Sequence, residues 1–422
     1  MNTGPMAVIV VCDSLRPDLV DPECAPTLSR LRAEAAYFSG YRAIFPSTTR
    51  TSAACIATGC LPASHGFLGN TMVIDEGEGL VCLSAGKPDF LERLRRATGN
   101  ALSRRTLHER VAASGAAIAM SNVSPGAAYV LDPEGAGYVY HRSGSFGPGR
   151  RPVLDGLAIE TGAAGDTEMT VRFCDEVIAE RSPPFAILWL SEPDHTGHHA
   201  ALGSPEHRAA IREADGNVER VLRRVSELDP GGDRILLAVC SDHGMQTIRR
   251  RVDVAAALVA AGLKEGLDSR DVVLAPQGTS VLIHLEKSAQ ERLPRIVEWL
   301  ETQDFAASVH SGAALAQVGL PSTGSLAIAV SLASDDEPNA FGVRGRSDVA
   351  ENPLAGEYLP GHGQHGGLGA YEQRPFLVLR GAGFAPGARG DPASLIDLAP
   401  TVLRHLGLDA SGLDGSPLQA VR

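Results

Sequence analysis

The chain has 422 residues, of which 44% are hydrophobic and 46 are glycine, so it can bury the core of one elaborated domain or of two. Its formal net charge of -12 at pH 7 excludes extended contact with a polyanion, so no nucleic acid polymer is expected as a partner. A small anionic substrate remains compatible with this charge, because a metal site supplies positive charge locally.

The cysteines and the N-terminus indicate where the protein works. The seven cysteines are an odd number without a closely spaced pair of the zinc-ribbon or redox kind, so we expect reduced, mostly buried thiols. The opening MNTGPMAVIVVCDS has no basic region and no small-residue cleavage site, which favours the cytoplasm. No apolar stretch approaches the roughly 20 residues of a membrane span, so no membrane partner is expected. An oligomer is compatible with the sequence, which carries no signal for its size.

Short apolar runs that suit strands buried on both faces of a parallel sheet recur along the chain. The predicted strands are 7–11, 185–190, 235–240 and 376–379. Helical patterns lie between or beyond them, at 27–35, 89–97, 167–180, 205–228 and 395–406. This alternation indicates an α/β fold, a three-layer α/β/α sandwich around a mostly parallel sheet.

The stretch from 252 to 359 interrupts the alternation. Helices are expected there over 252–263 and 289–302, and extended segments over 272–285 and 325–332. We therefore expect an inserted α+β cap subdomain at 252–359, and a catalytic core formed by 1–251 and 360–422. The segment 135–165 is rich in Gly, Pro and Arg with little periodicity, which predicts a long loop near the site entrance.

Four separated segments concentrate Asp, His or hydroxyl side chains, and three of them follow predicted strands. They are Cys12-Asp13-Ser14, Asp194-His195-Thr196-Gly197-His198, Asp242-His243-Gly244 and His362-Gly363-Gln364-His365. One such segment alone is more often a helix cap or a turn. Open α/β sheets bind ligands beyond the carboxyl ends of their strands, and mixed carboxylate and imidazole ligands select zinc or, less often, manganese. The residues themselves thus predict a metal-binding cluster at strand ends.

Seven segments, in the same order along the chain, resemble the type I phosphodiesterase and nucleotide pyrophosphatase family of the alkaline phosphatase superfamily, with phosphonoacetate hydrolases as a nearby branch. The segments are VIVVCDSLRPD (8–18), APTLSRLRAE (25–34), FPSTTRTSAACIATGCLPASHGFLGN (45–70), DHTGHH (194–199), SDHGM (241–245), QHGGLGAYEQRPFLVL (364–379) and DLAPTVLRHLGL (397–408). The resemblance implies a two-metal hydrolase of phosphoryl bonds that uses two Zn²⁺ ions, with Mn²⁺ as the alternative. The implied ligands of one ion are Asp194, His198 and His365. Those of the other are Asp13, Asp242, His243 and the Thr49 oxygen.

The resemblance also implies that Thr49 is the nucleophile. In these families the nucleophile lies ten residues before the glycine of a Thr-Gly pair, here Thr58-Gly59. Coordination to a dication lowers the pKa of a threonine hydroxyl, and the family mechanism is a double displacement through a covalent phosphothreonine. Asn70 and the backbone N–H of Arg50 are the expected donors to a phosphoryl oxygen.

For several residues near these motifs, the sequence is compatible with a role in the site and with no such role. His195, His199, His362 and the Arg50 side chain are either site groups or residues without a role in the site. His65 is expected to order the loop behind the nucleophile. The arginine runs 93–96 and 249–251 are expected to be solvated faces rather than nucleic-acid sites.

The substrate is less constrained than the reaction. The segment 119–126 has no lysine where phosphonoacetate hydrolases carry a pair, and Arg50-Thr51-Ser52 stands where nucleotide pyrophosphatases more commonly carry Phe-Pro-Asn. We expect a phosphodiesterase or nucleotide pyrophosphatase acting on a small anionic phosphorylated substrate. The alternatives are a phosphonate hydrolase, a phosphomonoesterase with a specialised biosynthetic substrate, and a metal-stabilised binding protein that has lost catalysis.

Overall fold

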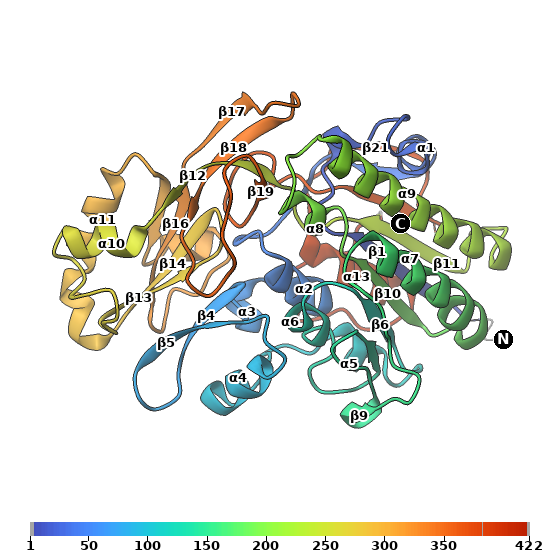
Figure 1. The fold of residues 1–422 in the computed structure, drawn as a ribbon. Coiled ribbons are helices and arrows are strands. Elements are labelled where there is room, and N and C mark those ends of the chain that lie inside the picture. The colour runs from blue at the N-terminus through green and yellow to red at the C-terminus, as the bar shows by residue number, and fades with distance from the viewer. Residues whose placement is uncertain (1–3, 382, 420–422) are drawn as a thin grey trace.

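The computed structural model describes residues 4–381 and 383–419, and among them a ten-stranded sheet has the order β21-β2-β20-β11-β1-β10-β6-β7-β8-β9 (Figure 1). Its strands are β1 Met6–Cys12, β2 Ala36–Phe38, β6 Ile118–Ser121, β7 Tyr138–Tyr140, β8 Phe146–Gly147, β9 Arg151–Pro152, β10 Phe185–Leu190, β11 Ile235–Cys240, β20 Leu377–Arg380 and β21 Gly387–Arg389. The central strands β11, β1, β10, β6 and β7 are parallel. β20 is antiparallel to β11, a direction that its apolar run does not encode.

Helices cover both faces of this sheet, because the side chains of the central strands alternate between two apolar cores. Ile9 of β1 packs into one core and Val10 into the other. The first core also contains side chains of α2 Thr49–Thr58, α4 Phe90–Thr98, α5 Leu107–Val111, α6 Pro125–Tyr129 and α13 Leu398–His405. The second contains side chains of α1 Pro26–Glu34, α7 Ala163–Arg172 and α9 Pro205–Leu228. The predicted three-layer α/β/α sandwich is confirmed.

Two predicted elements differ from the observed ones. The helix expected over 167–180 begins earlier, at Ala163, and continues from Phe173 to Arg181 as a π-helix. The segment 135–165 contains β7, β8 and β9, which extend the central sheet at one edge, so the long loop expected there is interrupted by three short strands. Strands of two or three residues are too short for a period-2 pattern, and successive pairing of β7 with β6, β8 with β7 and β9 with β8 stabilises them instead.

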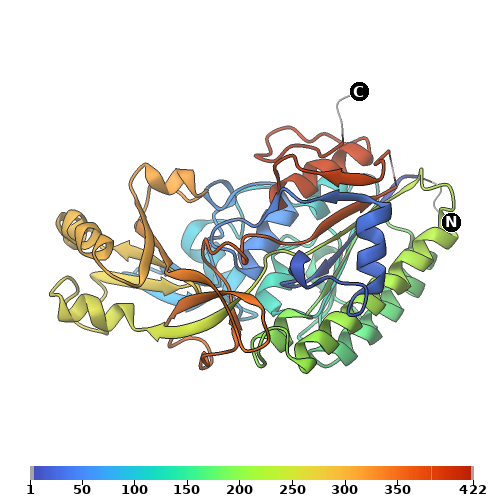
Figure 2. The ribbon, with the colours of Figure 1, turned by 90° about the horizontal axis from the view of Figure 1, so that it is seen from above.

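A second lobe extends to one side of the sandwich and contains two smaller sheets (Figure 2). One has the order β13-β14-β16-β15, with strands Val272–Pro276, Ser280–Leu285, Leu326–Leu332 and Ala306–Ser311. Its core includes side chains of α10 Val254–Ala260 and α11 Leu293–Glu301. The other has the order β17-β18-β12-β19, with strands Ser334–Pro338, Arg344–Ala350, Gln246–Val252 and Gly363–Gln364. This second sheet contains β17 and β18 from within the segment 252–359, but also β12 and β19 from the two sides of it. The division into core and cap therefore stays a proposal.

The remaining short elements link these layers. They are β3 Tyr41–Arg42, β4 Thr71–Asp75, β5 Leu80–Ser84, β22 Ala393–Ser394, α3 Pro62–His65, α8 Asp194–Gly197 and α12 Ala314–Gln317. All seven cysteines are free, and every one except Cys82 is buried, as the sequence predicts. Among the helices of the described residues, none has both the length and the apolar character needed to cross a membrane.

Candidate active site

The parallel strands bring three carboxylates together at one edge of the central sheet. Asp13 directly follows β1, and Asp242 lies two residues beyond the end of β11. Asp194 begins α8, shortly after β10. Because β1 pairs with both β10 and β11, the loops that follow these three strands are neighbours at their carboxyl ends.

Asp13, Asp242 and His243 form a fully buried group whose ligand atoms lie within 4.8 Å of one another. His243 Nε2 is 3.0 Å from Asp242 Oδ2 and 3.6 Å from Asp13 Oδ1. Thr49 Oγ1 lies 3.2 Å from the same Nε2 atom. The threonine hydroxyl is therefore adjacent to this group.

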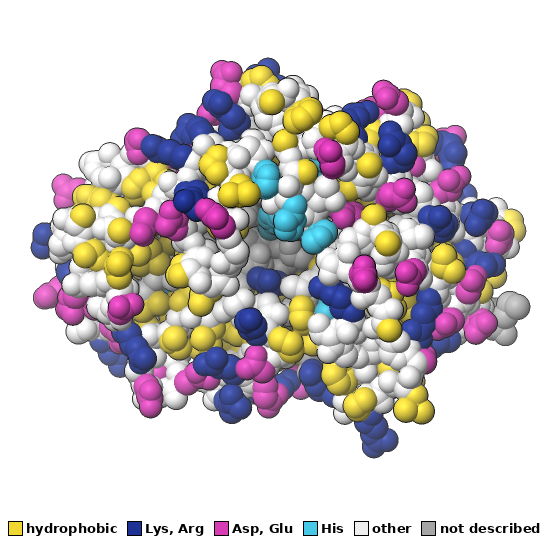
Figure 3. All heavy atoms as spheres, viewed as in Figure 1, with side chains coloured by type: hydrophobic (Ala, Val, Ile, Leu, Met, Phe, Trp, Pro, Cys, Tyr) yellow, Lys and Arg dark blue, Asp and Glu magenta, His cyan; other side chains and the backbone are white. Residues whose placement is uncertain are grey.

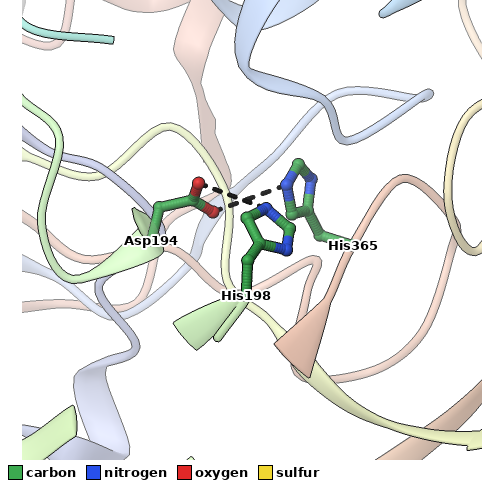
Figure 4. A group of neighbouring side chains, drawn as sticks. All are labelled: Asp194, His198 and His365. Carbon is green, nitrogen blue, oxygen red and sulfur yellow. Dashed lines mark ion pairs between the residues drawn. The ribbon is translucent and has the colours of Figure 1, made fainter. Parts of the chain in front are cut away.

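Asp194, His198 and His365 form a second, partly exposed group (Figure 4). Both imidazoles face the carboxylate, with His198 Nε2 3.2 Å from Asp194 Oδ2 and His365 Nε2 3.5 Å from Asp194 Oδ1. The His365 ring also stacks on the His243 ring, with centroids 3.7 Å apart. The two groups are thus immediate neighbours, and the described residues offer no other such metal-binding cluster.

Unsatisfied oxygens show that these groups fit divalent cations. Asp13 Oδ1, Asp194 Oδ1 and Asp242 Oδ2 are buried and accept no hydrogen bond from any described residue, which is costly for a carboxylate. Burial, followed by the charges of Asp242 and Asp194, raises the pKa of Asp13 well above its ordinary value. A cation in each group removes both penalties, since it satisfies the oxygens and offsets the like charges.

The three histidines are oriented for metal binding. Each has Nδ1 within hydrogen-bond distance of a backbone carbonyl, which can only accept, so Nδ1 carries the proton and Nε2 keeps its lone pair. The carbonyls are those of Gly363 for His198 at 3.1 Å, Ser47 for His365 at 2.7 Å and Gly244 for His243 at 2.9 Å. Each free lone pair then faces the carboxylates of its group.

Among the clustered threonines, only Thr49 lines the cavity. The hydroxyls of Thr48 and Thr51 are fully buried and form a hydrogen bond with each other at 2.9 Å. Thr49 is the first residue of α2, where the free N–H groups of a helix favour an anion. The Arg50 N–H donates to Asn70 Oδ1 at 3.3 Å, which leaves the Asn70 amide nitrogen free for another acceptor.

A cavity of about 260 Å³ lies over both groups and is lined by Thr49, Asn70, Asp13, Asp194, His198 and His365, together with Arg50, Asn122, Val123, Ser124, Arg142, Thr161, Ser191 and His195. In the space-filling view, histidines gather around a hollow at the centre of this face, and arginine or lysine side chains lie within it (Figure 3). The predicted site residues on the cavity wall thus come from separate segments of the chain. Asp242 and His243 lie beneath it, fully buried.

A sequence profile described as type I phosphodiesterase / nucleotide pyrophosphatase matches residues 7–316. The chain belongs to this family. It is 34% identical over 122 residues to the human ectonucleotide pyrophosphatase/phosphodiesterase family member 7, and the match covers 26% of each protein. The chain therefore spans about a quarter of the length of that relative.

Solved structures of the family show the same fold. Murine ectonucleotide pyrophosphatase/phosphodiesterase 5, as an inactive threonine-to-alanine variant in complex with AMP, matches with a TM-score of 0.68 and 15% identity over 98% of this chain and 97% of that one. Its human counterpart matches with a TM-score of 0.66 and 14% identity over 97% of each chain. At these identities the comparison establishes the fold of this family member.

The structure also assigns the residues whose roles the sequence left open. Arg50 is a wall residue of the cavity rather than a solvated side chain, because its Nη1 donates to the Asn70 carbonyl at 3.0 Å. Burial lowers the pKa of Arg50 to about 10. His195 lines the cavity, whereas His362 lies within hydrogen-bond distance of the His198 carbonyl at 3.1 Å and is not part of the wall. His65 is buried and accepts from the Phe67 N–H at 3.1 Å, so it orders the turn after α3.

The arginine run 249–251 is solvated in part, since Arg250 and Arg251 are exposed and Arg249 is half-buried, but it also forms a network of ion pairs. These arginines lie on β12, and each forms an ion pair with an acidic side chain of the second lobe. Two of them bind the buried Asp348, whose carboxylate needs the compensating charge. The arginine run therefore joins neighbouring strands of the second lobe instead of facing solvent alone.

Three residues that position the site escape sequence reasoning. Trp189 donates its indole N–H to Asp13 Oδ2 at 3.0 Å. Gln277 accepts the Asn70 N–H at 2.6 Å, although it lies in the second lobe. Glu372 accepts from the N–H groups of Gly366 and Gly367 and so fixes the loop that carries His365. Only Glu372 lies in a segment that resembles the family, QHGGLGAYEQRPF, and that is the one signal that could have indicated it.

Proposed function

We propose that this protein hydrolyses phosphodiester or pyrophosphate bonds of small substrates through a covalent phosphothreonine at Thr49. The observation that carries the proposal is the position of the Thr49 hydroxyl, which lines the cavity and lies 3.2 Å from His243 Nε2. Two divalent ions, zinc with manganese as the alternative, would be held by Asp13, Asp242, His243 and Thr49 on one side and by Asp194, His198 and His365 on the other. When bound, they supply a lowered hydroxyl pKa and positive charge for the phosphoryl oxygens.

In this proposal the chain's own groups orient and stabilise the phosphoryl centre. The Thr49 oxygen forms a bond to phosphorus as the bond to the leaving oxygen breaks. The Asn70 amide nitrogen donates to a nonbridging oxygen, where negative charge gathers in the transition state, and the Arg50 N–H orients that amide through its bond to Asn70 Oδ1. A water molecule then cleaves the phosphothreonine, which restores the Thr49 hydroxyl and consumes one water per turnover.

The relatives support this reaction class. The curated human relative is named as a nucleotide pyrophosphatase and phosphodiesterase. The murine structure in complex with AMP is inactive after the exchange of one threonine for alanine, which is consistent with a threonine that is essential to the chemistry. We therefore propose a small anionic phosphorylated substrate for this chain.

Location and domain organisation are further parts of the proposal. Seven unpaired cysteines support a reducing compartment such as the cytoplasm. The small sheets of the second lobe support an inserted cap at 252–359. Gln277 of this lobe bonds the backbone N–H of Asn70, so the cap would help to hold one of the phosphoryl donors.

The proposal is tested with the zinc-loaded enzyme and bis-p-nitrophenyl phosphate. Thr49→Ala should lower kcat by about 10⁴-fold or more, as expected when a nucleophile is lost. Thr51→Ala is the matched control, because its hydroxyl is bonded to Thr48 away from the cavity, and it should keep activity within about tenfold, at the cost of about 1 kcal/mol of stability. Full activity in Thr49→Ala would overturn the proposal.

A further inference from the structure

The cavity wall opposite the ligand groups is built around the segment 122–124, which follows β6. Arg142 is fixed to this segment, since its Nη1 donates to the carbonyls of Asn122 at 2.7 Å and Val123 at 3.0 Å. The same Nη1 also donates to the side-chain oxygen of Asn122 at 3.0 Å. Arg50 is fixed to the next residue, because its Nε donates to Ser124 Oγ at 3.0 Å. Two guanidinium groups therefore form hydrogen bonds with successive residues of one segment, and both arginines line the cavity.

Arg142 forms no direct ion pair with any described carboxylate, although the charge of Asp166 lies near enough to act on it. Among residues 4–381 and 383–419, no carboxylate forms an ion pair with Arg142 or with Arg50, and no described group accepts a hydrogen bond from Arg142 Nε or Nη2. The neighbouring Asp166 is already engaged by Asn122 Nδ2 at 2.8 Å and by the Ser191 N–H at 3.0 Å. Arg142 is thus held in place through Nη1, while its Nε and Nη2 groups can still donate hydrogen bonds. Other arginines of this protein commonly form ion pairs with acidic side chains.

The surroundings of Arg142 suit a small polar group. Asn122, Ser124 and Thr161 line the same cavity, and no Phe, Tyr or Trp of the described residues lines it. Its volume of about 260 Å³ lies just below the range of ligand pockets, which measure about 300–1,000 Å³. A nucleobase therefore finds no Phe, Tyr or Trp to stack on here, whereas an anion finds a fixed guanidinium with free N–H groups.

We propose that Arg142 binds a second anionic group of the substrate, a terminal phosphoryl or carboxylate group, beyond the phosphoryl group that is cleaved at Thr49. This inference rests on the proposed function and specifies its substrate class as small phosphate or phosphonate esters with two anionic ends. Arg142 restores a positive charge next to the segment 119–126, which itself carries no lysine.

The test compares three p-nitrophenyl esters that share one leaving group, those of methylphosphonate, phosphonoacetate and methylenediphosphonate. The first has no second anion, the second has a carboxylate and the third has a phosphonate. The wild type should prefer at least one charged ester over the methyl ester by about 10- to 100-fold in kcat/KM, as expected for hydrogen bonds to a charged group. The preferred charged ester identifies the anion.

Arg142→Gln should abolish this preference, so that the ratio of kcat/KM between charged and methyl esters falls to near one. Arg142→Lys should recover part of the ratio, because it keeps the charge but loses the fork of donors. Arg151→Gln is the control, since Arg151 is an exposed arginine of the same region outside the cavity, and it should keep the wild-type ratio. A ratio that is unchanged in Arg142→Gln, or lost equally in Arg151→Gln, would overturn the inference.

A measurement of anion binding without turnover tests the role of Arg142 independently of the proposed hydrolysis at Thr49. Methylenediphosphonate and phosphonoacetate should bind the zinc-loaded Thr49→Ala protein more tightly than methylphosphonate in calorimetric titrations, and Arg142→Gln in that background should remove the difference. This measurement needs no turnover, so it can succeed even if none of the esters is hydrolysed. Equal affinities in the two proteins for all three anions would exclude a role for Arg142 in anion binding.

Discussion

The two walls of the cavity are built in different ways. The wall with the metal-ligand candidates follows the ends of three parallel strands, and its residues lie in segments that resemble the family. The other wall consists of the segment 122–124, which follows β6, of Arg142, which follows β7, and of Thr161. Hydrogen bonds from Arg142 to Asn122 and Val123 join the first two, and none of these residues lies in a segment that resembles the family. Connecting segments vary among related proteins more than the strands that they join, and the residues of the second wall all lie in such segments outside the family motifs. The difference suggests that the first wall sets the reaction and the second selects the substrate.

The largest effect on metal content should come from removing a ligand of the buried group beneath the first wall. Asp242→Asn should reduce bound zinc from two equivalents towards one and lower kcat/KM by more than about 100-fold, since even partners of metal ligands contribute about 10- to 100-fold. Metal analysis and bis-p-nitrophenyl phosphate hydrolysis measure the two effects. Two tightly bound equivalents in this variant would contradict the ligand assignment.

Asn70→Ala sharpens the comparison between the walls. Loss of one donor to the transition-state oxyanion should lower kcat by about 10²- to 10³-fold with little change in KM. All three p-nitrophenyl esters should lose activity equally, so the ratio that Arg142 controls should stay constant. Asn100→Ala, at an exposed position outside the cavity, is the control. A changed ratio in Asn70→Ala would show that the two walls do not act separately.

A smaller effect on metal affinity is expected when a metal ligand is kept but loses a hydrogen bond that orients it. Trp189→Phe removes the indole N–H that donates to Asp13 Oδ2, and it should weaken metal affinity by about 10- to 100-fold. The measurement is competition with a zinc chelator. Trp299→Phe is the matched control, because the second tryptophan of the chain packs on Phe305 in the second lobe. Equal affinities in the two variants would mean that the indole N–H does not support Asp13.

The smallest effect should appear in the pH dependence of stability. Burial lowers the pKa of His65 to about 3, so between about pH 6.5 and pH 3 the unfolded chain binds a proton there that the folded chain does not. Stability from this residue is complete above pH 6.5 and falls as the pH is lowered. His65→Gln should reduce the slope of the unfolding free energy by about 1.4 kcal/mol per pH unit in this range. Urea unfolding of both metal-free proteins at several pH values checks it, and identical slopes would contradict it.

Much of the core fold could be predicted because its signals are local. The runs at 185–190 and 235–240 and the helix 205–228 match the observed elements residue for residue. The short strands β7, β8 and β9 could not be predicted, since pairing with the preceding strand in each case, rather than a pattern of their own, stabilises them. The direction of β20 was hidden for a similar reason, because an apolar run does not encode its orientation.

The sequence by itself determined the α/β class and, through its resemblance, the family and the choice of Thr49 and the ligand candidates. Strand periodicity and motif order are properties of neighbouring residues, so they survive without a structure. Only the tertiary structure showed that Thr48 and Thr51 bond each other while Thr49 lines the cavity. It alone placed Arg142 against the segment 122–124 with free donors. Such contacts join residues through space, and no local pattern records them.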